Sequence, residues 1–357
     1  MTKRILYSML IFVPVAIGAE LLHADPVLVF ILSALGIIPL ADLIGEGTEE
    51  LAARTGPRLG GLLNATLGNA AELIITIFAI REGLLTLVVA SITGSIIGNL
   101  VLVTGISVLV GGLKHGHQKF DRRQAGLNAT MVVLAVIVLV IPSLFSRAID
   151  PSLNPNLPSE RFFSEIVAGV IIVLYVLSVI YSLTAKREED DILTRESAAQ
   201  HAPRWSVRTS LLVLVGSTVG VAVLSEFLVG AVEPVVTSLG MTEFFLGLII
   251  IPLVGNIAEH LVAVEVAAKD NMELSLAISL GSSLQIALFV APLLVFISLL
   301  FDHALLLVFT DLELIALFSA SLVTALISLD GESNWLEGAQ LLAVYLIIAV
   351  AFFFVPG

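Results

Sequence analysis

The chain consists largely of apolar stretches of about twenty residues, the length that a helix needs to cross the hydrocarbon core of a bilayer. Only short polar segments separate most of them. Hydrophobic residues make up 58% of the 357 positions, charged residues make up 13%, and the mean hydropathy is +1.06. These values are typical of a polytopic membrane protein and lie far outside the range of soluble domains.

The hydropathy pattern predicts an all-α polytopic membrane protein with eleven transmembrane helices. The fourth, eighth and ninth exceed the length needed to span, so we expect tilt or local breaks in them. The expected helices cover residues 5–22, 26–45, 61–80, 84–112, 127–146, 162–184, 208–231, 242–268, 272–301, 304–328 and 337–355.

Two short motifs indicate an internal duplication. Residues 68–72 read Gly-Asn-Ala-Ala-Glu, and residues 255–259, 187 positions later, read Gly-Asn-Ile-Ala-Glu. Setting the first helix aside leaves five helices per repeat, and an odd number means that the repeats enter the membrane from opposite sides. The expected organisation is an extra N-terminal helix in 1–25, a first five-helix repeat in 26–184, an acidic cytoplasmic linker in 185–207 and a second, inverted five-helix repeat in 208–357.

The distribution of basic residues predicts a cytoplasmic amino terminus. In this orientation 14 of the 17 Lys and Arg residues lie on the inner side, and only Arg81, Arg147 and Arg161 lie outside. No small-x-small cleavage site follows the first helix, so we expect it to be retained. No organelle signal is evident, which favours a multi-pass protein of the cell membrane.

Charge and cysteine usage exclude several classes of partner and site. The formal charge of −13 argues against nucleic acid as a partner. The chain has no cysteine, so neither disulfides nor thiolate metal sites arise.

Each motif places a glutamate within an apolar helix, and such a residue in lipid marks a functional site by default. Glu72 and Glu259 occupy matching positions in the two repeats. Asn69 and Asn256 lie three residues earlier and share a helix face with the acids. The pattern therefore predicts a cation site near the membrane midplane, where the repeats meet.

Neighbouring residues can enlarge the set of oxygen ligands. Gly68 and Gly255 permit either a helix break, which would free backbone carbonyls as ligands, or a close helix contact. Pro252 favours a break or a kink in the second copy. The helix after each motif can add side chains, namely Ser95, Asn99, Ser282, Ser283 and Gln285.

Electrostatics favours a dication that competes with protons. A buried acid costs roughly 2.5–3.5 kcal/mol at the bilayer centre, and two acids within reach cannot both stay ionised and unpaired. A dication bound by Glu72 and Glu259 removes this penalty, and calcium prefers oxygen ligands of these kinds. We expect no cofactor, only transported calcium and protons, with a titration that belongs to the pair of acids.

Further acids predict weaker sites in the first helix of each repeat. Asp42 and Glu49 are matched by Glu226 and Glu233 at an offset of 184, whereas an offset of 187 would match Glu46 with Glu233. They could be gating or proton-relay residues, or interfacial acids that simply reach water.

The linker carries a run of acids, Glu188, Glu189, Asp190 and Asp191. It could be a solvated cytoplasmic segment or a regulatory collar that gathers divalent cations. Asp311 and Glu313 are expected in a vestibule or subunit contact. His260 is expected either to contact residues that line the site, without binding the ion itself, or to pack beside them.

The two motifs, each followed by a helix with Gly94-Ser95 or Gly281-Ser282, resemble the calcium/proton exchangers of the cation/proton exchanger family, within the cation/calcium exchanger superfamily. The resemblance runs from the second helix onward. It implies that Glu72 and Glu259 are the central calcium and proton residues, lined by the neighbouring Asn, Gly, Ser and Gln.

The resemblance also implies a gating pair formed by helices 26–45 and 208–231, which slides past a core of the other eight, and possible homo-trimers. Sodium/calcium exchangers carry Pro directly before the corresponding glutamates. Here no Pro precedes Glu72 or Glu259, which favours protons as the counter-ion.

Other functions remain as alternatives. A sodium-coupled or manganese-transporting exchanger would keep the scaffold and change the ions. A cation channel would need a continuous pore, against which inverted repeats with broken helices argue. A di-metal enzyme would need more Glu and His within its helices, so we expect no enzyme activity.

Overall fold

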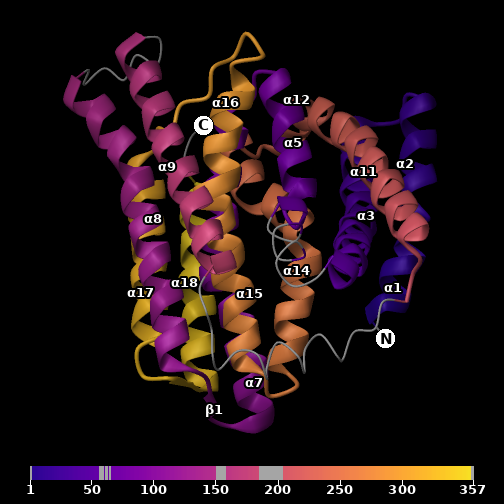
Figure 1. Ribbon diagram of the computed structural model, residues 1–357. Coiled ribbons are helices and arrows are strands. Elements are labelled where there is room, and N and C mark those ends of the chain that lie inside the picture. The colour runs from indigo at the N-terminus through magenta and orange to yellow at the C-terminus, as the bar shows by residue number, and fades with distance from the viewer. Residues whose placement is uncertain are drawn as a thin grey trace.

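The computed structural model describes residues 2–55, 60, 63, 66–149, 158–184 and 204–354, and it is almost entirely helical. Within these residues, nine helices are long and apolar enough to cross a membrane. The chain is therefore a polytopic membrane protein. Figure 1 shows α2, α3 and α11 on one side and α8, α9, α17 and α18 on the other, with α5, α14 and α15 between them.

The first half of the chain contains α1 (Thr2–Met9), α2 (Phe12–Leu21), α3 (Pro26–Thr55), α5 (Ala70–Arg81), α6 (Leu85–Ile97), the π-helix η1 (Gly98–Val103), α7 (Thr104–His115), β1 (Gln118–Lys119), α8 (Arg122–Ile149) and α9 (Pro158–Thr184). The second half contains α11 (Val207–Gly230), α12 (Val232–Leu239), α13 (Glu243–Phe245), η2 (Leu246–Ile250), α14 (Ile251–Ala267), α15 (Met272–Gln285), η3 (Ile286–Val290), α16 (Ala291–Ser298), α17 (Asp311–Ile327), β2 (Glu332–Ser333) and α18 (Trp335–Phe353).

Nine of the eleven expected helices correspond to these long spans. The helix expected at 61–80 corresponds to α5, which has 12 residues in the described part of the chain, and the one expected at 304–328 corresponds to α17, which has 17. The helix expected at 26–45 continues to Thr55, and the one expected at 5–22 is divided into α1 and α2. The count of eleven and the inverted repeat stay predictions.

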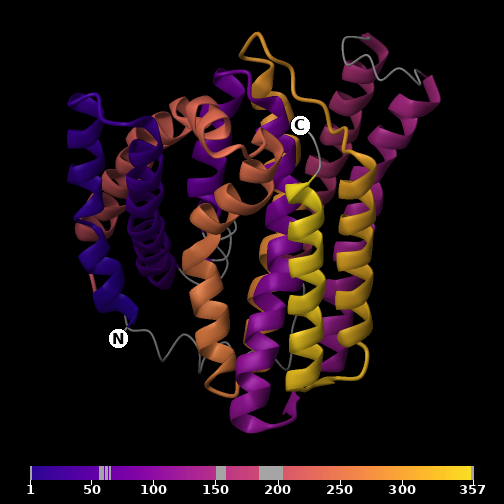
Figure 2. The ribbon, with the colours of Figure 1, turned by 180° about the vertical axis from the view of Figure 1, so that it is seen from behind.

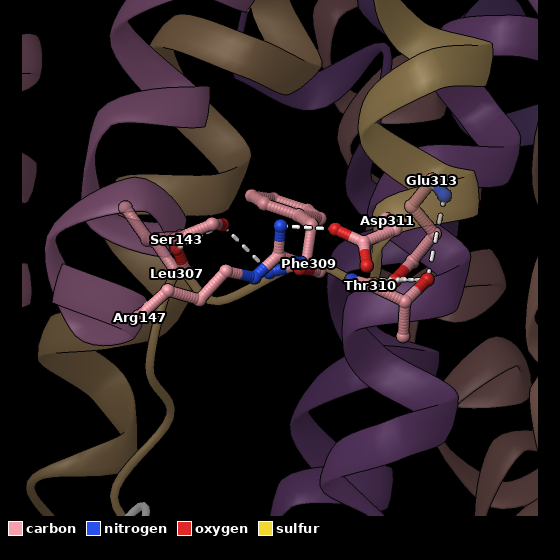
Figure 3. Close-up of polar contacts among 7 residues, drawn as sticks. All are labelled: Ser143, Arg147, Leu307, Phe309, Thr310, Asp311 and Glu313. Carbon is pink, nitrogen blue, oxygen red and sulfur yellow. Dashed lines mark hydrogen bonds and ion pairs between the residues drawn. The ribbon is translucent and has the colours of Figure 1, made fainter. Parts of the chain in front are cut away.

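The expectation of helix at 304–310 is wrong, because this apolar segment has no helical or other regular secondary structure. Side chains of α8 bind its backbone (Figure 3): Ser143 Oγ accepts from Phe309 N at 2.8 Å and donates to Leu307 O at 3.5 Å, and Arg147 Nη2 donates to Phe309 O at 3.2 Å. These bonds replace the bonds of a helix, so a non-helical backbone can be buried here.

A capping box then starts α17. Thr310 Oγ1 accepts from Glu313 N, and the Glu313 carboxylate accepts from Thr310 N at 2.8 Å. Thr93 of α6 also donates to Glu313 at 2.8 Å, and only 1% of Glu313 is exposed. The expected vestibule or subunit-contact role is therefore wrong for Glu313, which caps a helix inside the protein. Asp311 pairs with Arg147 of α8 (Figure 3).

The three helices expected to tilt or break each contain a π-helical segment, η1, η2 or η3. Pro252 follows η2 and Pro292 follows η3. Because proline has no N–H, the carbonyl four residues before it loses its α-helical partner, which favours the wider turn. In η1 the hydroxyl of Thr104 donates to Asn99 O at 3.0 Å instead.

The helices α3 and α11 cross closely (Figures 1 and 2). A Cβ added to Gly36 of α3 would meet Leu224 of α11, and one added to Gly220 of α11 would meet Leu40 of α3. The contact is reciprocal: Gly36 corresponds to Gly220 and Leu40 corresponds to Leu224, both at the offset of 184. Glycine at these two positions lets the helix backbones approach.

The extra N-terminal helix docks on α3, because Lys3 and Tyr7 both bind Glu46. At the far end of α3, Glu50 accepts from Trp205 N at 3.0 Å, just before α11 begins. These polar contacts join α1, α3 and α11 at the side of the molecule where the amino terminus lies (Figure 1).

A two-stranded ribbon fixes the end of α14. Strand β1 pairs with β2 in antiparallel register, Gln118 opposite Ser333. Gln118 Nε2 donates to Ala267 O at 3.0 Å, and Lys114 Nζ donates to Ala268 O at 2.7 Å. These donors bind carbonyls at the carboxyl end of α14, where a helix leaves its last carbonyls without α-helical partners, and so they tie α7 and the ribbon to that end.

Candidate cation site

Glu72 is buried at the start of α5. Gly68 and Asn69 form a turn, α5 begins at Ala70, and Glu72 lies in the first helical turn with 1% of its surface exposed. The unpaired N–H groups and the dipole of a helix start favour negative charge at this position. The helix start at Ala70 therefore lies where its N–H groups and dipole can stabilise the carboxylate of Glu72.

The second copy of the motif behaves differently. Gly255 and Asn256 lie within α14, which runs from Ile251 to Ala267 without interruption. Of the two expectations for this glycine, a break or a close helix contact, the structure shows the contact. Pro252 occupies the first turn of α14, where proline is favoured, and the local irregularity lies just before it, in η2. The break at the motif lies in the first copy instead.

The two motifs meet through Glu72. Asn256 Nδ2 donates to Glu72 Oε2 at 3.2 Å and to Ser95 Oγ at 3.2 Å, and Ser95 donates to Glu72 Oε1. A Cβ on Gly255 would lie 3.3 Å from the Cβ of Glu72, so glycine allows α14 and α5 to approach at this point. The structure thus brings Glu72, Ser95, Gly255 and Asn256 together.

Glu259 lies one turn after Asn256 on α14, partly buried. Its charge and that of Glu72 are close enough to repel each other, and Ser282 of α15 lies against its carboxylate. Asn99 Nδ2 donates to Ser282 Oγ at 3.0 Å. Both acids therefore face a polar region shared by η1, α5, α14 and α15.

Asn69 binds across the repeats, because its Nδ2 donates to Gln285 Oε1 of α15 at 2.7 Å. Among the buried side-chain oxygens that lack a hydrogen-bond partner in the described part of the chain, three belong to the two motifs: Asn69 Oδ1, Asn256 Oδ1 and Glu259 Oε2. Buried oxygens without donors are costly unless a proton or a cation binds them. These carboxylate and amide oxygens fit a hard cation such as calcium.

His260 contributes more than packing to this region. Its ring Nε2 lies 3.2 Å from Asn99 Oδ1, so it joins the chain of contacts that leads through Ser282 to Glu259. The position next to Glu259 was the one sign of this role in the sequence, but adjacent residues of a helix point about 100° apart. The partner Asn99 lies in η1, which belongs to another helix and cannot be found from the local sequence.

The second group of acids lies away from this cluster. Glu226 of α11 pairs with Arg81, the last residue of α5, at 3.3 Å. One carboxylate oxygen of Asp42 is buried without a partner in the described structure, and Glu49 and Glu233 are exposed. The acidic run 188–191 lies outside the described residues.

Comparison with known proteins identifies the family of the chain. The sodium/calcium exchanger protein family matches residues 26–184 and 209–354. The chain is 42% identical over 373 residues to a Ca²⁺/H⁺ antiporter of Synechocystis sp., covering 99% of this chain and 98% of the relative. It is 43% identical over 346 residues to the Ca²⁺/H⁺ antiporter ChaA of Bacillus subtilis, covering 96% of each.

Solved structures show the same fold. The native YfkE structure has a TM-score of 0.84 and 39% identity, and the comparison covers 98% of this chain and 100% of that one. The H⁺/Ca²⁺ exchanger CAX has a TM-score of 0.75 at 16% identity, covering 99% and 92%, which shows a likeness of fold alone. The chain therefore belongs to the sodium/calcium exchanger protein family, in the part whose full-length relatives are calcium/proton antiporters.

Proposed function

We propose that this protein is a secondary antiporter that exchanges cytosolic Ca²⁺ for H⁺ by alternating access, with Glu72 and Glu259 bound in turn by calcium or by protons. Its full-length relatives carry the names of antiporters, so it is a transporter and not an enzyme. The observation that carries the proposal is the meeting of the two motifs, where Asn256 of α14 binds the carboxylate of Glu72 on α5.

Competition follows from the burial of the two acids. A pair of close, buried carboxylates cannot remain doubly ionised without a counter-charge. One Ca²⁺ or added protons can each supply that charge, and both cannot do so fully at once. Exchange results if the protein changes the side to which the site opens only when the pair is neutralised.

The surrounding oxygens support calcium as the substrate. Asn69, Asn256 and Glu259 present buried oxygens without partners, and Ser282 and Gln285 lie beside them. Calcium binds six to eight oxygens from carboxylates, amides, carbonyls and water. Manganese also accepts such ligands, so transport of Mn²⁺ is the second candidate.

Three observations support the inverted repeat that alternating access would use. The crossing of α3 and α11 is reciprocal at an offset of 184. The π-helices η1 and η3 begin 188 residues apart, in corresponding helices. The family matches two successive stretches whose limits nearly coincide with those of the expected repeats.

The orientation is part of the proposal. A cytoplasmic amino terminus follows from the positive-inside rule, and it places the β1–β2 ribbon and the start of α11 on the inner side. We also propose that the protein resides in the cell membrane and assembles as a homo-oligomer, for which a trimer is the expectation from the resemblance.

Transport in vesicles tests the ions directly. In inside-out vesicles with an acid interior, calcium uptake should require the pH gradient and continue without sodium. Uptake that needs a sodium gradient would show that the proton-coupling proposal is wrong. Parallel uptake of Mn²⁺ separates the two candidate dications.

Neutral variants test the residues. Glu72→Gln and Glu259→Gln should each abolish exchange, because amides cannot carry the charge that both ions neutralise. Glu273→Gln, at an exposed site in the first turn of α15, is the matched control and should transport normally. Gel-filtration profiles should match for all three variants, and near-normal exchange in either site variant would contradict the assignment.

A further inference from the structure

Arg81 and Glu226 join two parts of the molecule on the side opposite the amino terminus. Arg81 ends α5, the helix that carries Glu72, and its Nη1 lies 3.3 Å from Glu226 Oε1 of α11. Arg81 also lies 5.7 Å from the centre of the Phe78 ring, which holds the guanidinium over the end of α5. The pair therefore bridges a site helix and the crossed pair formed by α3 and α11.

Matching positions of the two repeats differ in their surroundings. Ile75 follows Glu72 by one helical turn and is 0% exposed, whereas Val262 follows Glu259 by one turn and is 45% exposed. The helix α5 packs against α11 and α16. The turn of α5 that follows Glu72 is thus enclosed by protein toward the predicted outer side, and an opening on that side has to move α11 or α16 away from it.

We propose that Arg81 and Glu226 form an outer latch, positioning residues that hold α11 against α5 and so keep the cation site closed toward the outside. The inference rests on the proposed antiport function, because only a protein that alternates between two openings needs such a bias. The latch must break when the outer side opens.

The repeat correspondence assigns a counterpart on the inner side. Asp42 of the first repeat corresponds to Glu226 of the second at the offset of 184. Arg81 corresponds to Ala268 at the offset of 187, and the next residue, Lys269, carries a positive charge like that of Arg81. Here the two are not paired with each other: Lys269 binds Glu265 at 2.6 Å, and Asp42 Oδ2 is buried without a partner. In the opposite state Lys269 and Asp42 pair and close the inner side.

An ion pair of this kind biases an equilibrium modestly. Arg81 and Glu226 are half exposed, and exposed pairs change an equilibrium ratio by up to about fivefold. A change of this size is enough to shift the population of two states that differ little in free energy.

Thiol labelling measures the outer opening, because the natural chain has no cysteine. Ile75→Cys reports opening to the outside, because Ile75 lies one turn beyond Glu72 and is buried here. An impermeant methanethiosulfonate reagent is added from one side of oriented vesicles, and the labelling rate is measured.

Loss of either latch charge should speed outer labelling. In the Ile75→Cys background, Arg81→Gln or Glu226→Gln should raise the rate from outside by up to about fivefold, and the exchanged pair Arg81→Glu with Glu226→Arg should restore the slow rate. Arg161→Gln is the matched control, because Arg161 pairs with Glu165 within α9. Asp42→Asn or Lys269→Gln should instead slow the outer labelling.

Unchanged labelling after loss of Arg81 or Glu226, or failure of the exchanged pair to restore the slow rate, would overturn the latch. A second measurement covers the case in which Ile75→Cys does not fold. A short thiol cross-linker between Arg81→Cys and Glu226→Cys should stop exchange until the link is cleaved, and continued exchange in the linked protein would also overturn the proposal.

The two proposals fail in different ways. If outer labelling ignores the latch while exchange still requires Glu72 and Glu259, the latch alone is wrong. If labelling follows the latch but no calcium moves against protons, the protein still alternates between two openings, so the latch stands and the proposed exchange of calcium for protons is wrong.

Discussion

The two motif asparagines, equivalent in sequence, bind different partners. Asn256 Nδ2 donates to the carboxylate of Glu72, whereas Asn69 Nδ2 donates to the amide oxygen of Gln285. Glu72 accepts from two side chains, and Glu259 keeps one buried oxygen without a partner. The duplicated acids are therefore not equivalent, and the amide of Asn256 supports the ionised form of only one of them.

Removal of that amide should change the competition between ions. Asn256→Ala deletes a donor to a charged group, worth roughly 1.5–3 kcal/mol, so protons should compete better and half-maximal calcium binding should move to higher pH by about one unit. Asn69→Ala is the matched control and should move it less, because Asn69 donates to no carboxylate. Calcium binding measured by calorimetry across pH 6–9 would show an equal shift in both variants if this assignment is wrong.

At the scale of the elements, close packing of α6 against η2 depends on glycine. A Cβ at Gly94 of α6 would overlap the carbonyl of Leu248, while a Cβ at Gly281, the matching position of α15, would meet nothing within 4 Å. Glycine is therefore needed for a close approach of two backbones at position 94, but not at the matching position 281.

This difference predicts opposite outcomes for the same substitution. Gly94→Ala should destabilise the protein by roughly 1–3 kcal/mol, because two backbones must separate to admit the methyl group. Gly281→Ala should be neutral or slightly stabilising, since alanine favours the helix. Thermal unfolding in detergent, followed by circular dichroism, checks both, and equal melting temperatures for the two variants would contradict the packing account.

At the scale of the whole molecule, the candidate site joins helices that are distant in the sequence. Asn69 binds Gln285 across 216 residues, and Asn256 binds Glu72 across 184. Calcium bound at this site would add contacts between both halves, so its binding free energy would add to the stability of the folded protein.

Calcium should therefore raise the melting temperature. At 100 times its dissociation constant, calcium adds about 2.7 kcal/mol. The increase should shrink as the pH falls, because protons occupy the same acids, and it should vanish in Glu72→Gln. Melting scans with and without calcium at pH 8 and pH 6 provide the measurement, and an undiminished increase in Glu72→Gln would place the bound calcium elsewhere.

The sequence predicted which segments form membrane helices better than it predicted where those helices begin, end or break. Apolar length predicted the membrane helices, but the segment 304–310, which is as apolar as a membrane helix, is not helical, because Ser143 and Arg147 of α8 bind its backbone. Such partners are distant in sequence, so a local window cannot detect them. The motif at 255–259 likewise allowed a break or a close helix contact, and only the packing of Gly255 against Glu72 decided for the contact.

The sequence by itself determined that the chain spans a membrane, that its two halves share a motif, and that two acids lie in apolar helices, because hydropathy and spacing are local properties. Only the tertiary structure decided that Asn256 binds Glu72, that His260 reaches Asn99, and that Glu226 pairs with Arg81. Each of these contacts joins helices whose relative depth and rotation are set by packing, and no single helix carries that information.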